Sequence, residues 1–523
     1  MKFFKYIALG SLALSLGSGM TSCVNDLDLE PDDPNKQTTL TTADQWYGYF
    51  QSLYGNLCYE AGLTPAGVDG GAGIWTRVHW NLQEITADEA IILNSWNDPG
   101  YADLKYNTWV ADNTWEYMAY QREATSAKLC SEFLSKVDGA AGVVNADLIE
   151  QMKAEARVLR AYCYYYMIDL YGRGPWITTE AVGVEAPVYD RKQLFEAVTA
   201  ELEDVIANGA LLDSKEQAYG RLSKQAAEMI LAKLYLNAEV YTGTPMYDKC
   251  AQWCKEIMKD TNTLADNYEY LFCADNDKYV GKGKEIIFAV PQDANHMQSY
   301  GGTTYLTAGA YFGDIEDSEK AYLGFGGNAW GGLKMRPELV NCLNEFPGDV
   351  RQLYFVGSYT NSLEDLQDNT PTGGGYMCTK FKYLTSDQID NHNAEGFAAA
   401  SVFCSTDYPV FRLADVYLML SECQLRGVND ADPGFTYFNK VRARAHLADM
   451  TPNLDQLLNE RQRELYWEGH RRQDLIRFGK YTGNAYNWSW KGGVYEGRAL
   501  DATRSVFAIP YQYVGTVGQN VGY

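Results

Sequence analysis

Apolar side chains recur along most of the chain at steps of three and four residues, which is the spacing of an α-helix. The clearest example is the segment 148–171, which stops at a run of glycine and proline, "YGRGPW". Because glycine and proline end helices, we predict one helix here with a single buried face. Its apolar stripe consists of Ala156, Leu159, Cys163, Met167 and Leu170.

The same spacing predicts further helices over residues 192–206 and 223–241, the second capped by Ser223. Near the C-terminus, "YPVFRLADVYLMLSECQLRG" (408–427) and "PGFTYFNKVRARAHL" (433–447) are predicted to form another helix pair. Paired amphipathic helices with tyrosine-rich faces are typical of tetratricopeptide repeats, although the period here is irregular. The predicted fold class is therefore mostly α, a tetratricopeptide-like scaffold of helix pairs.

The helical rhythm is interrupted between residues 262 and 404, which are rich in Gly, Tyr, Asn and Thr. Such composition predicts loops and short strands, and loops on a rigid scaffold commonly carry binding surfaces. We therefore predict a helical scaffold over 41–261 and 405–523, with 262–404 as a loop-rich insertion that carries short strands and contributes to the site.

Charged residues fall on or beside the apolar stripe of one further predicted helix, "NERQRELYWEGHRRQDLIRFGKY" (459–481). Arg461 and Glu468 continue the steps of three and four set by Leu454, Leu458 and Leu465. A charge in that position must be paired, so a clamp between packed helices is the main interpretation. An acid/base pair that includes His470 is the functional alternative.

The N-terminus has the pattern of an export signal. Lys2 and Lys5 precede a short apolar run, and the residues before Cys23 resemble the lipobox of bacterial lipoproteins, in which the cysteine is acylated. Residues 1–22 are thus predicted to be a signal peptide and 23–40 an acylated Cys followed by an acidic tether, which resembles the surface-export signals of Bacteroidota lipoproteins. An ordinary cleaved secretory signal is the alternative.

Composition excludes two classes of partner. The net charge of −24 argues against nucleic acid and against electrostatic binding to anionic lipid, because both need clustered Lys and Arg. The 40 tyrosines and 12 tryptophans are partly core, but several stand in Gly- and Asn-rich loops where packing does not require them. Those aromatic residues are candidates for binding a flat ligand surface.

No cofactor or metal is expected. Cys250 and Cys254 lie on one helix face, but zinc needs two more ligands, so a structural pair is the main interpretation. Asp275 and Asp277 are oxygen ligands suited to calcium, yet the spacing of a calcium loop is missing, and the site stays unassigned.

Three segments together carry a family resemblance: "EARVLRAYCYYYMIDLYGRGPW", "YPVFRLADVYLMLSECQL" and "ERQRELYWEGHRRQDLIRFG". With the lipobox and acidic tether, they resemble the SusD/RagB family of outer-membrane glycan-binding lipoproteins. The resemblance implies a lipid-anchored protein at the cell surface that binds starch or other α-glucan oligosaccharides and delivers them to a TonB-dependent outer-membrane transporter. A different glycan in the same role is the alternative.

The resemblance also implies the site residues, because a starch-binding member of the family stacks an arc of aromatic rings against the sugar. A pyranose ring has apolar faces for such stacking and a rim of hydroxyls that polar side chains bind. One aromatic position is ambiguous between Trp96 and Asn94, with Trp96 preferred. The expected glycan-binding residues are Asp69, Arg77, Trp96, Asn97, Tyr300 and Trp330.

We predict that the protein is not an enzyme. The sequence has no GxSxG elbow, no HExxH motif and no phosphate loop, and its five histidines are dispersed. A glycoside hydrolase needs only two suitably spaced carboxylates, so that alternative stays open with 68 acidic residues, as does a scaffold that binds peptides.

Overall fold

The structure is a computed structural model. It describes residues 40–60, 62–178, 185–281, 283–313, 315–356, 375–391 and 402–523. The predicted signal peptide, Cys23 and nearly all of the predicted tether lie outside the described residues.

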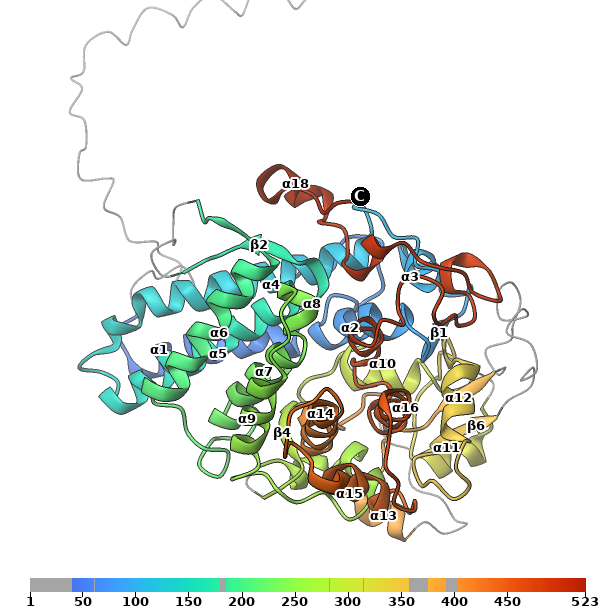
Figure 1. The fold of residues 1–523 in the computed structure, drawn as a ribbon. Coiled ribbons are helices and arrows are strands. Elements are labelled where there is room, and N and C mark those ends of the chain that lie inside the picture. Colours follow the sequence, from blue (N-terminus) through green and yellow to red (C-terminus); the bar gives the residue numbers. More distant parts are fainter. Residues whose placement is uncertain are drawn as a thin grey trace, which may run out of the picture.

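A row of helices, each packed against the next, forms the scaffold (Figure 1). In chain order these helices are α1 (Ala43–Cys58), α4 (Thr114–Lys136), α5 (Ala146–Tyr166), α6 (Arg191–Asn208), α7 (Lys224–Leu236) and α9 (Tyr247–Ile257). The C-terminal helices continue the row: α14 (Leu413–Leu425) packs on α9, and α15 (Thr436–Arg444) and α16 (Leu454–Leu465) pack on α14. The mostly α fold of packed helix pairs is confirmed.

Side-chain caps fix where these helices begin. The side chain of Ser223 accepts a hydrogen bond from the backbone of Ala226, as predicted, and Asn145 caps α5 in the same way. Helix α5 then continues into a π-helical turn, Met167–Tyr171, and stops at Gly172, whose φ is 68°. The predicted helix over 148–171 is therefore confirmed.

Smaller helices fill the rest of the scaffold. They are α2 (Trp75–Trp80), which continues as a π-helical turn over Asn81–Ile85, α3 (Tyr101–Tyr106), α8 (Ala238–Thr242), α17 (Arg471–Arg477) and α18 (Tyr511–Val517).

The prediction of a single helix over 408–427 is wrong at its first five residues. Tyr408–Arg412 form strand β8, which pairs antiparallel with β4 (Ile286–Val290), and α14 starts only at Leu413. All five residues of β8 are buried, and a strand buried on both faces lacks the alternation that distinguishes it from a helix.

The segment 459–481 is also not one helix. Helix α16 ends at Leu465 and α17 begins at Arg471, and between them the φ angles of Trp467 and Gly469 are 62° and 77°. The backbone groups freed by this break are bound from a distant segment, because Glu89 accepts from the Trp467 N–H.

Short antiparallel strand pairs complete the described part of the chain: β1 (Ala90–Ile92) with β5 (Leu333–Met335), β2 (Arg173–Pro175) with β3 (Val188–Asp190), β4 with β8, and β6 (Tyr354–Val356) with β7 (Tyr376–Cys378). The short strands predicted for 262–404 are thus present. The segment also contains short helices: α10 (Gly302–Ala308), α11 (Asp317–Leu323), α12 (Pro337–Leu343) and α13 (Ser386–Asp390).

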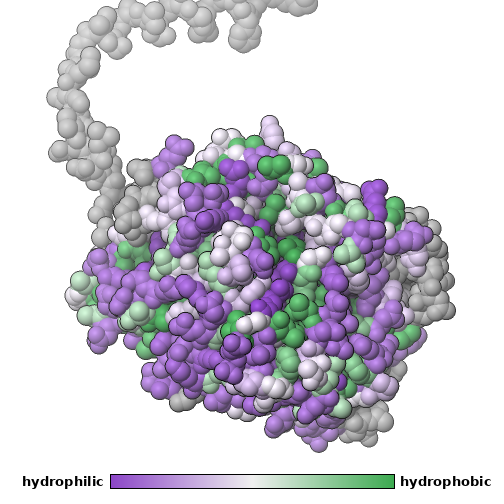
Figure 2. All heavy atoms as spheres, in the orientation of Figure 1, coloured by the Kyte–Doolittle hydropathy of each residue, from purple (hydrophilic) through white to green (hydrophobic). Residues whose placement is uncertain are grey.

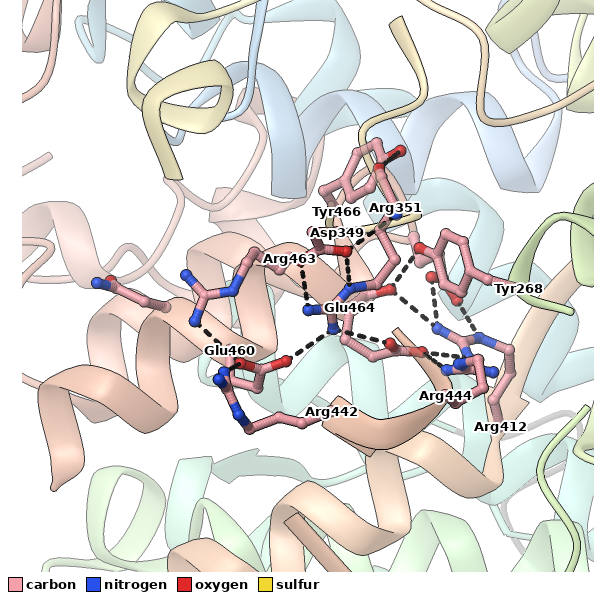
Figure 3. Close-up of polar contacts among 12 residues, drawn as sticks. Tyr268, Asp349, Arg351, Arg412, Arg442, Arg444, Glu460, Arg463, Glu464 and Tyr466 are labelled. Carbon is pink, nitrogen blue, oxygen red and sulfur yellow. Dashed lines mark hydrogen bonds and ion pairs between the residues drawn. The ribbon is translucent and has the colours of Figure 1, made fainter. Parts of the chain in front are cut away.

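The charges predicted inside the helix packing are paired, as expected. Arg461 Nη1 lies 2.8 Å from Asp415, and Glu468 accepts from Arg412 Nε at 2.6 Å. Also on α16, Glu460 and Glu464 bind buried arginines in one continuous network (Figure 3). His470 lies 3.1 Å from Lys233 Nζ, and burial and that charge lower its pKa to about 3, which makes it part of the packing rather than an exposed acid or base.

Hydrophilic side chains cover most of the face shown in Figure 2, with apolar residues in small groups between them. In the part of the chain that the structure describes, no helix combines the length and apolar character needed to cross a membrane.

Candidate functional site

The pairing of β1 with β5 brings together two loops that are far apart in sequence. Ile92 is opposite Leu333, and the Leu93 N–H donates to the Gly332 carbonyl at 2.8 Å, which extends the ladder by one step. The loop that follows β1 and the loop that precedes β5 therefore meet. As a result the rings of Trp96 and Trp330 lie 6.3 Å apart, with their planes at 49°.

Trp96 packs directly on the backbone at Gly332. A Cβ atom added at Gly332 would lie only 1.9 Å from Cε2 of the Trp96 ring, and a Cβ at Gly309 would be 3.3 Å from the same indole. Position 332 therefore requires glycine because the Trp96 indole occupies the space of a side chain, and not because of the backbone conformation there.

Tyr300 lies beside Trp330, at a point where two backbone segments cross closely. A Cβ at Gly71 would lie 2.5 Å from the Gly301 nitrogen, and one at Gly301 would lie 2.7 Å from the Gly71 carbonyl oxygen. Glycines on both sides let the segments touch. The Tyr300 ring is 47% exposed and lies 5.8 Å from Trp330, with the planes at 61°.

These segments enclose a cleft of about 700 Å³. Five of the six residues predicted to bind glycan line it, which brings together residues more than 200 positions apart in the chain. The lining consists of Gly67, Val68, Asp69, Ser95, Trp96, Asn97, Asp98, Tyr300 and Trp330.

The ambiguous aromatic position has a clear geometry. Trp96 lines the cleft, whereas the Asn94 side chain accepts a hydrogen bond from Lys105 and is not part of the lining. Trp96, Trp330 and Tyr300 thus form one continuous aromatic surface, which we call the aromatic arc.

Arg77 is the predicted site residue that does not line the cleft. Its side chain is 1% exposed and lies behind Asp69, with Nη1 2.8 Å from the Asp69 carboxylate. Nη2 donates to the Tyr101 hydroxyl at 3.1 Å, and the guanidinium lies 4.3 Å from the centre of the Tyr305 ring. Arg77 therefore positions the Asp69 carboxylate at the cleft.

Asp98 lines the cleft but was not predicted as a site residue. Burial raises its pKa above the usual range of a carboxyl; Arg77 opposes this increase, and the charge of Asp69 adds to it. Its place directly after Asn97, in "NSWNDPG", was the available signal. The arrangement presents aromatic faces and two carboxylates that accept hydrogen bonds.

Neither candidate metal position gathers ligands. Asp275 accepts hydrogen bonds from the backbone and side chain of Ser386, the first residue of α13. Cys250 and Cys254 lie with their sulfurs 4.0 Å apart on α9, as a structural pair. Across the described ranges, no group of three or more His, Cys, Asp or Glu side chains is placed to hold a metal ion.

Comparisons with known proteins indicate the family to which the chain is related. A family model described as "SusD family" matches residues 320–509, and one described as "Starch-binding associating with outer membrane" matches residues 72–236. The chain is 28% identical over 578 residues to the starch-binding protein SusD of Bacteroides thetaiotaomicron, covering 100% of this chain and 99% of that protein.

Solved structures show the same fold. Surface glycan-binding protein A from Bacteroides uniformis aligns with a TM-score of 0.69 at 18% identity, covering 92% of this chain and 99% of that one. Surface glycan-binding protein A from Bacteroides thetaiotaomicron, solved in complex with laminarihexaose, aligns with a TM-score of 0.67 at 19% identity, covering 92% of this chain and 100% of that one.

The chain belongs to the SusD/RagB family of surface glycan-binding proteins. Proteins of this family associate with the outer membrane, and they bind glycans without cleaving them. The glycoside-hydrolase alternative therefore does not apply to the carboxylates of the cleft.

Proposed function

We propose that the protein captures starch and malto-oligosaccharides at the cleft between the two loops joined by β1 and β5. The observation that carries this proposal is the aromatic arc of Trp96, Trp330 and Tyr300, whose neighbouring ring planes are inclined to each other at 49° and 61°. Rings inclined to one another fit a glucan that curves, as an α-1,4-linked chain does, better than a flat ribbon. Stacking supplies the apolar contact to each sugar face.

The polar groups of the cleft suit a neutral glycan. Asp69 and Asp98 accept hydrogen bonds from sugar hydroxyls, and Asn97 can both donate and accept. Among the described lining residues there is no Lys, Arg or His, because Arg77 is buried behind Asp69. A uronic-acid or sulfated chain would meet the carboxylates of Asp69 and Asp98 and find no free cation in the described lining to pair with, since Arg77 already pairs with Asp69.

A β-1,3-glucan is the second candidate ligand. Its chain also curves, and a protein of the same fold was solved with laminarihexaose. The same cleft and the same residues would then bind a different linkage.

In the same proposal, the protein is anchored at the cell surface and delivers the bound glycan to a transporter. Acylation at Cys23 anchors the protein to the outer membrane, and the acidic residues that follow form a tether over the surface. The glycan then passes to a TonB-dependent transporter. Weak stacking at an open cleft favours this transfer, because a bound chain must also be released.

Calorimetric titration of the purified protein tests the proposal. Maltoheptaose and a cyclic α-glucan are compared with laminarihexaose and a fructan, and each positive is repeated with Trp330→Ala. We expect heat from the α-glucans alone and a markedly lower affinity in the variant, with Tyr511→Ala as the control because Tyr511 is 77% exposed on α18 and does not line the cleft.

Two results would change the proposal in different ways. A signal from laminarihexaose alone would keep the site and replace the ligand. Binding of α-glucans that Trp330→Ala leaves unchanged would keep the ligand and reject the site.

A further inference from the structure

A second pocket, which we call the α1 pocket, lies outside the aromatic arc. It has a volume of about 400 Å³, within the range of small-molecule sites, and lies between α1, the turn at 218–221 and strand β4. Buried apolar side chains from two helices, α1 and α5, and from strand β4 form its floor: Phe50, Leu57, Met152 and Phe288. Tyr47, Gln51, Tyr54, Tyr219 and Arg221 surround its opening.

An ion pair holds the polar side of this pocket in place. Arg221 Nε and Nη2 donate to the two oxygens of Glu155 at 2.9 Å and 2.5 Å, and Glu155 is 1% exposed. Tyr54 donates to the same carboxylate at 2.7 Å. Because the guanidinium also lies 5.0 Å from the centre of the Phe50 ring, the polar side and the apolar floor are fixed to each other.

The remaining polar side chains of the opening are available to a ligand. Within the described residues, the side chains of Tyr47, Gln51 and Tyr219 form no hydrogen bond with another residue, and Tyr219 is 47% exposed. Aromatic walls over an apolar floor, with an amide and hydroxyls at the rim, match the two sides of a pyranose ring: its apolar faces and its hydroxyls. The charge of Arg221 is neutralised by Glu155, which favours an uncharged sugar.

The same two chain segments connect the α1 pocket to the cleft. Leu57 and Cys58 of the pocket lead through residues 59–66 to Gly67 of the cleft, and Pro291 leads through 292–299 to Tyr300. A fully extended chain covers at most about 3.4 Å per residue, so Pro291 and Tyr300 are no more than about 30 Å apart. A glycan of several sugar units spans such a distance.

We propose that the α1 pocket is a second saccharide-binding site, which takes sugar units of the same neutral glycan that occupies the aromatic arc. The inference rests on the proposed function of the cleft. Two linked sites turn the second contact into an intramolecular one, so a long chain binds more tightly than either short fragment.

Calorimetry with short and long ligands tests the inference, using the purified protein with maltotriose and amylose, and with laminaritriose and laminarin in parallel. We expect Tyr219→Ala to weaken binding of the long glucan about tenfold or more, since linkage of two sites contributes at least that factor. Binding of the short glucan to the cleft should stay unchanged. Tyr511→Ala is the matched control, an exposed tyrosine outside both sites.

A second pair of variants separates this inference from the proposed function. In Trp330→Ala, the remaining affinity for maltotriose should disappear when Tyr219→Ala is added. If Tyr219→Ala leaves the affinity for the long glucans unchanged while Trp330→Ala abolishes it, the α1 pocket is not a saccharide site and the cleft stands. If Tyr219→Ala alone abolishes binding and Trp330→Ala has no effect, the cleft is rejected and the α1 pocket stands.

Discussion

The position of the Trp96 ring depends on Gly332, which has no side chain. The indole occupies the space that a Cβ at Gly332 would fill, and its ring then continues into those of Trp330 and Tyr300. At the residue scale, the binding surface therefore depends on glycines as much as on the aromatic residues that touch the sugar.

Replacing Gly332 with alanine tests this dependence. The added methyl overlaps the Trp96 ring, and φ at Gly332 is not in the left-handed region, so the ring has to move while the backbone can stay. We expect glycan affinity to fall about fivefold, the equivalent of one aromatic contact of about 1 kcal/mol. Calorimetric titration measures it.

Gly515→Ala is the matched control, because a Cβ at that position of α18 meets no atom within 4 Å. An affinity of Gly332→Ala equal to that of the control would show that the Trp96 position does not matter for binding.

Single residues also show what sequence could and could not reveal. Tyr300 and Trp330 stand among glycines in loops, where a core role is unexpected, and both line the cleft. Arg77 matches the same family pattern, but its side chain is buried behind Asp69. That burial depends on how α2 packs in the fold, which the local sequence does not indicate. Asp98 was missed because an Asp before Pro is also what an ordinary turn contains.

At the scale of elements, the break between α16 and α17 is held by buried carboxylates. Glu84 accepts from the Gly469 and His470 N–H groups at 2.7 Å and 3.1 Å. Burial raises the pKa of Glu84 to about 7, and burial also raises the pKa of the neighbouring Glu89. The neutral carboxyl thus stabilises the fold below pH about 4.5, and this contribution is lost as the pH rises through about 7.

Glu84→Gln should remove that pH dependence. Glutamine keeps an acceptor for the two N–H groups and cannot ionise, so the free energy of unfolding should match the wild type at pH about 5 and exceed it by about 3 kcal/mol at pH about 8. Urea unfolding followed by tryptophan fluorescence measures the difference at each pH. A variant less stable than the wild type at both values would contradict the expectation.

Glu468→Gln is the control with the opposite sign. Glu468 accepts from Lys380 and from Arg412, each at 2.6 Å. Removing one partner of a buried charge network costs about 3 kcal/mol or more, so this variant should be destabilised at both pH values.

Element prediction succeeded where the apolar residues follow a helical period and failed for a short strand that is buried on both faces. The helix over 148–171 has a stripe of period 3.6 and was found. Strand β8 has no exposed side chain and was assigned to α14, and the break after Leu465 is fixed by Glu84 and Glu89, which lie nearly 400 residues earlier in the chain.

At the scale of the whole molecule, the N-terminal and C-terminal helices form one row (Figure 1). The segment between them supplies one side of the cleft, through Tyr300 and Trp330. The mostly α class followed from the sequence. The pairing of β1 with β5 did not, because three-residue strands separated by about 240 positions carry no local signal of their register.

The charge of the molecule leads to a prediction about salt. The protein carries a net charge of −24, but a neutral glycan gains nothing from the field around it. We expect the dissociation constant for the bound glucan to change less than twofold between low salt and physiological ionic strength, as measured by titration at both. A marked weakening with added salt would indicate a charged ligand.

The position of the bound sugar tests the glycan-binding site most directly. A crystal structure of the protein with the oligosaccharide that titration selects would locate it. We predict sugar rings stacked on Trp96, Trp330 and Tyr300, with hydroxyls bound by Asp69, Asn97 and Asp98. An oligosaccharide bound elsewhere, with the aromatic arc open to solvent, would contradict the assignment of this cleft as the glycan-binding site.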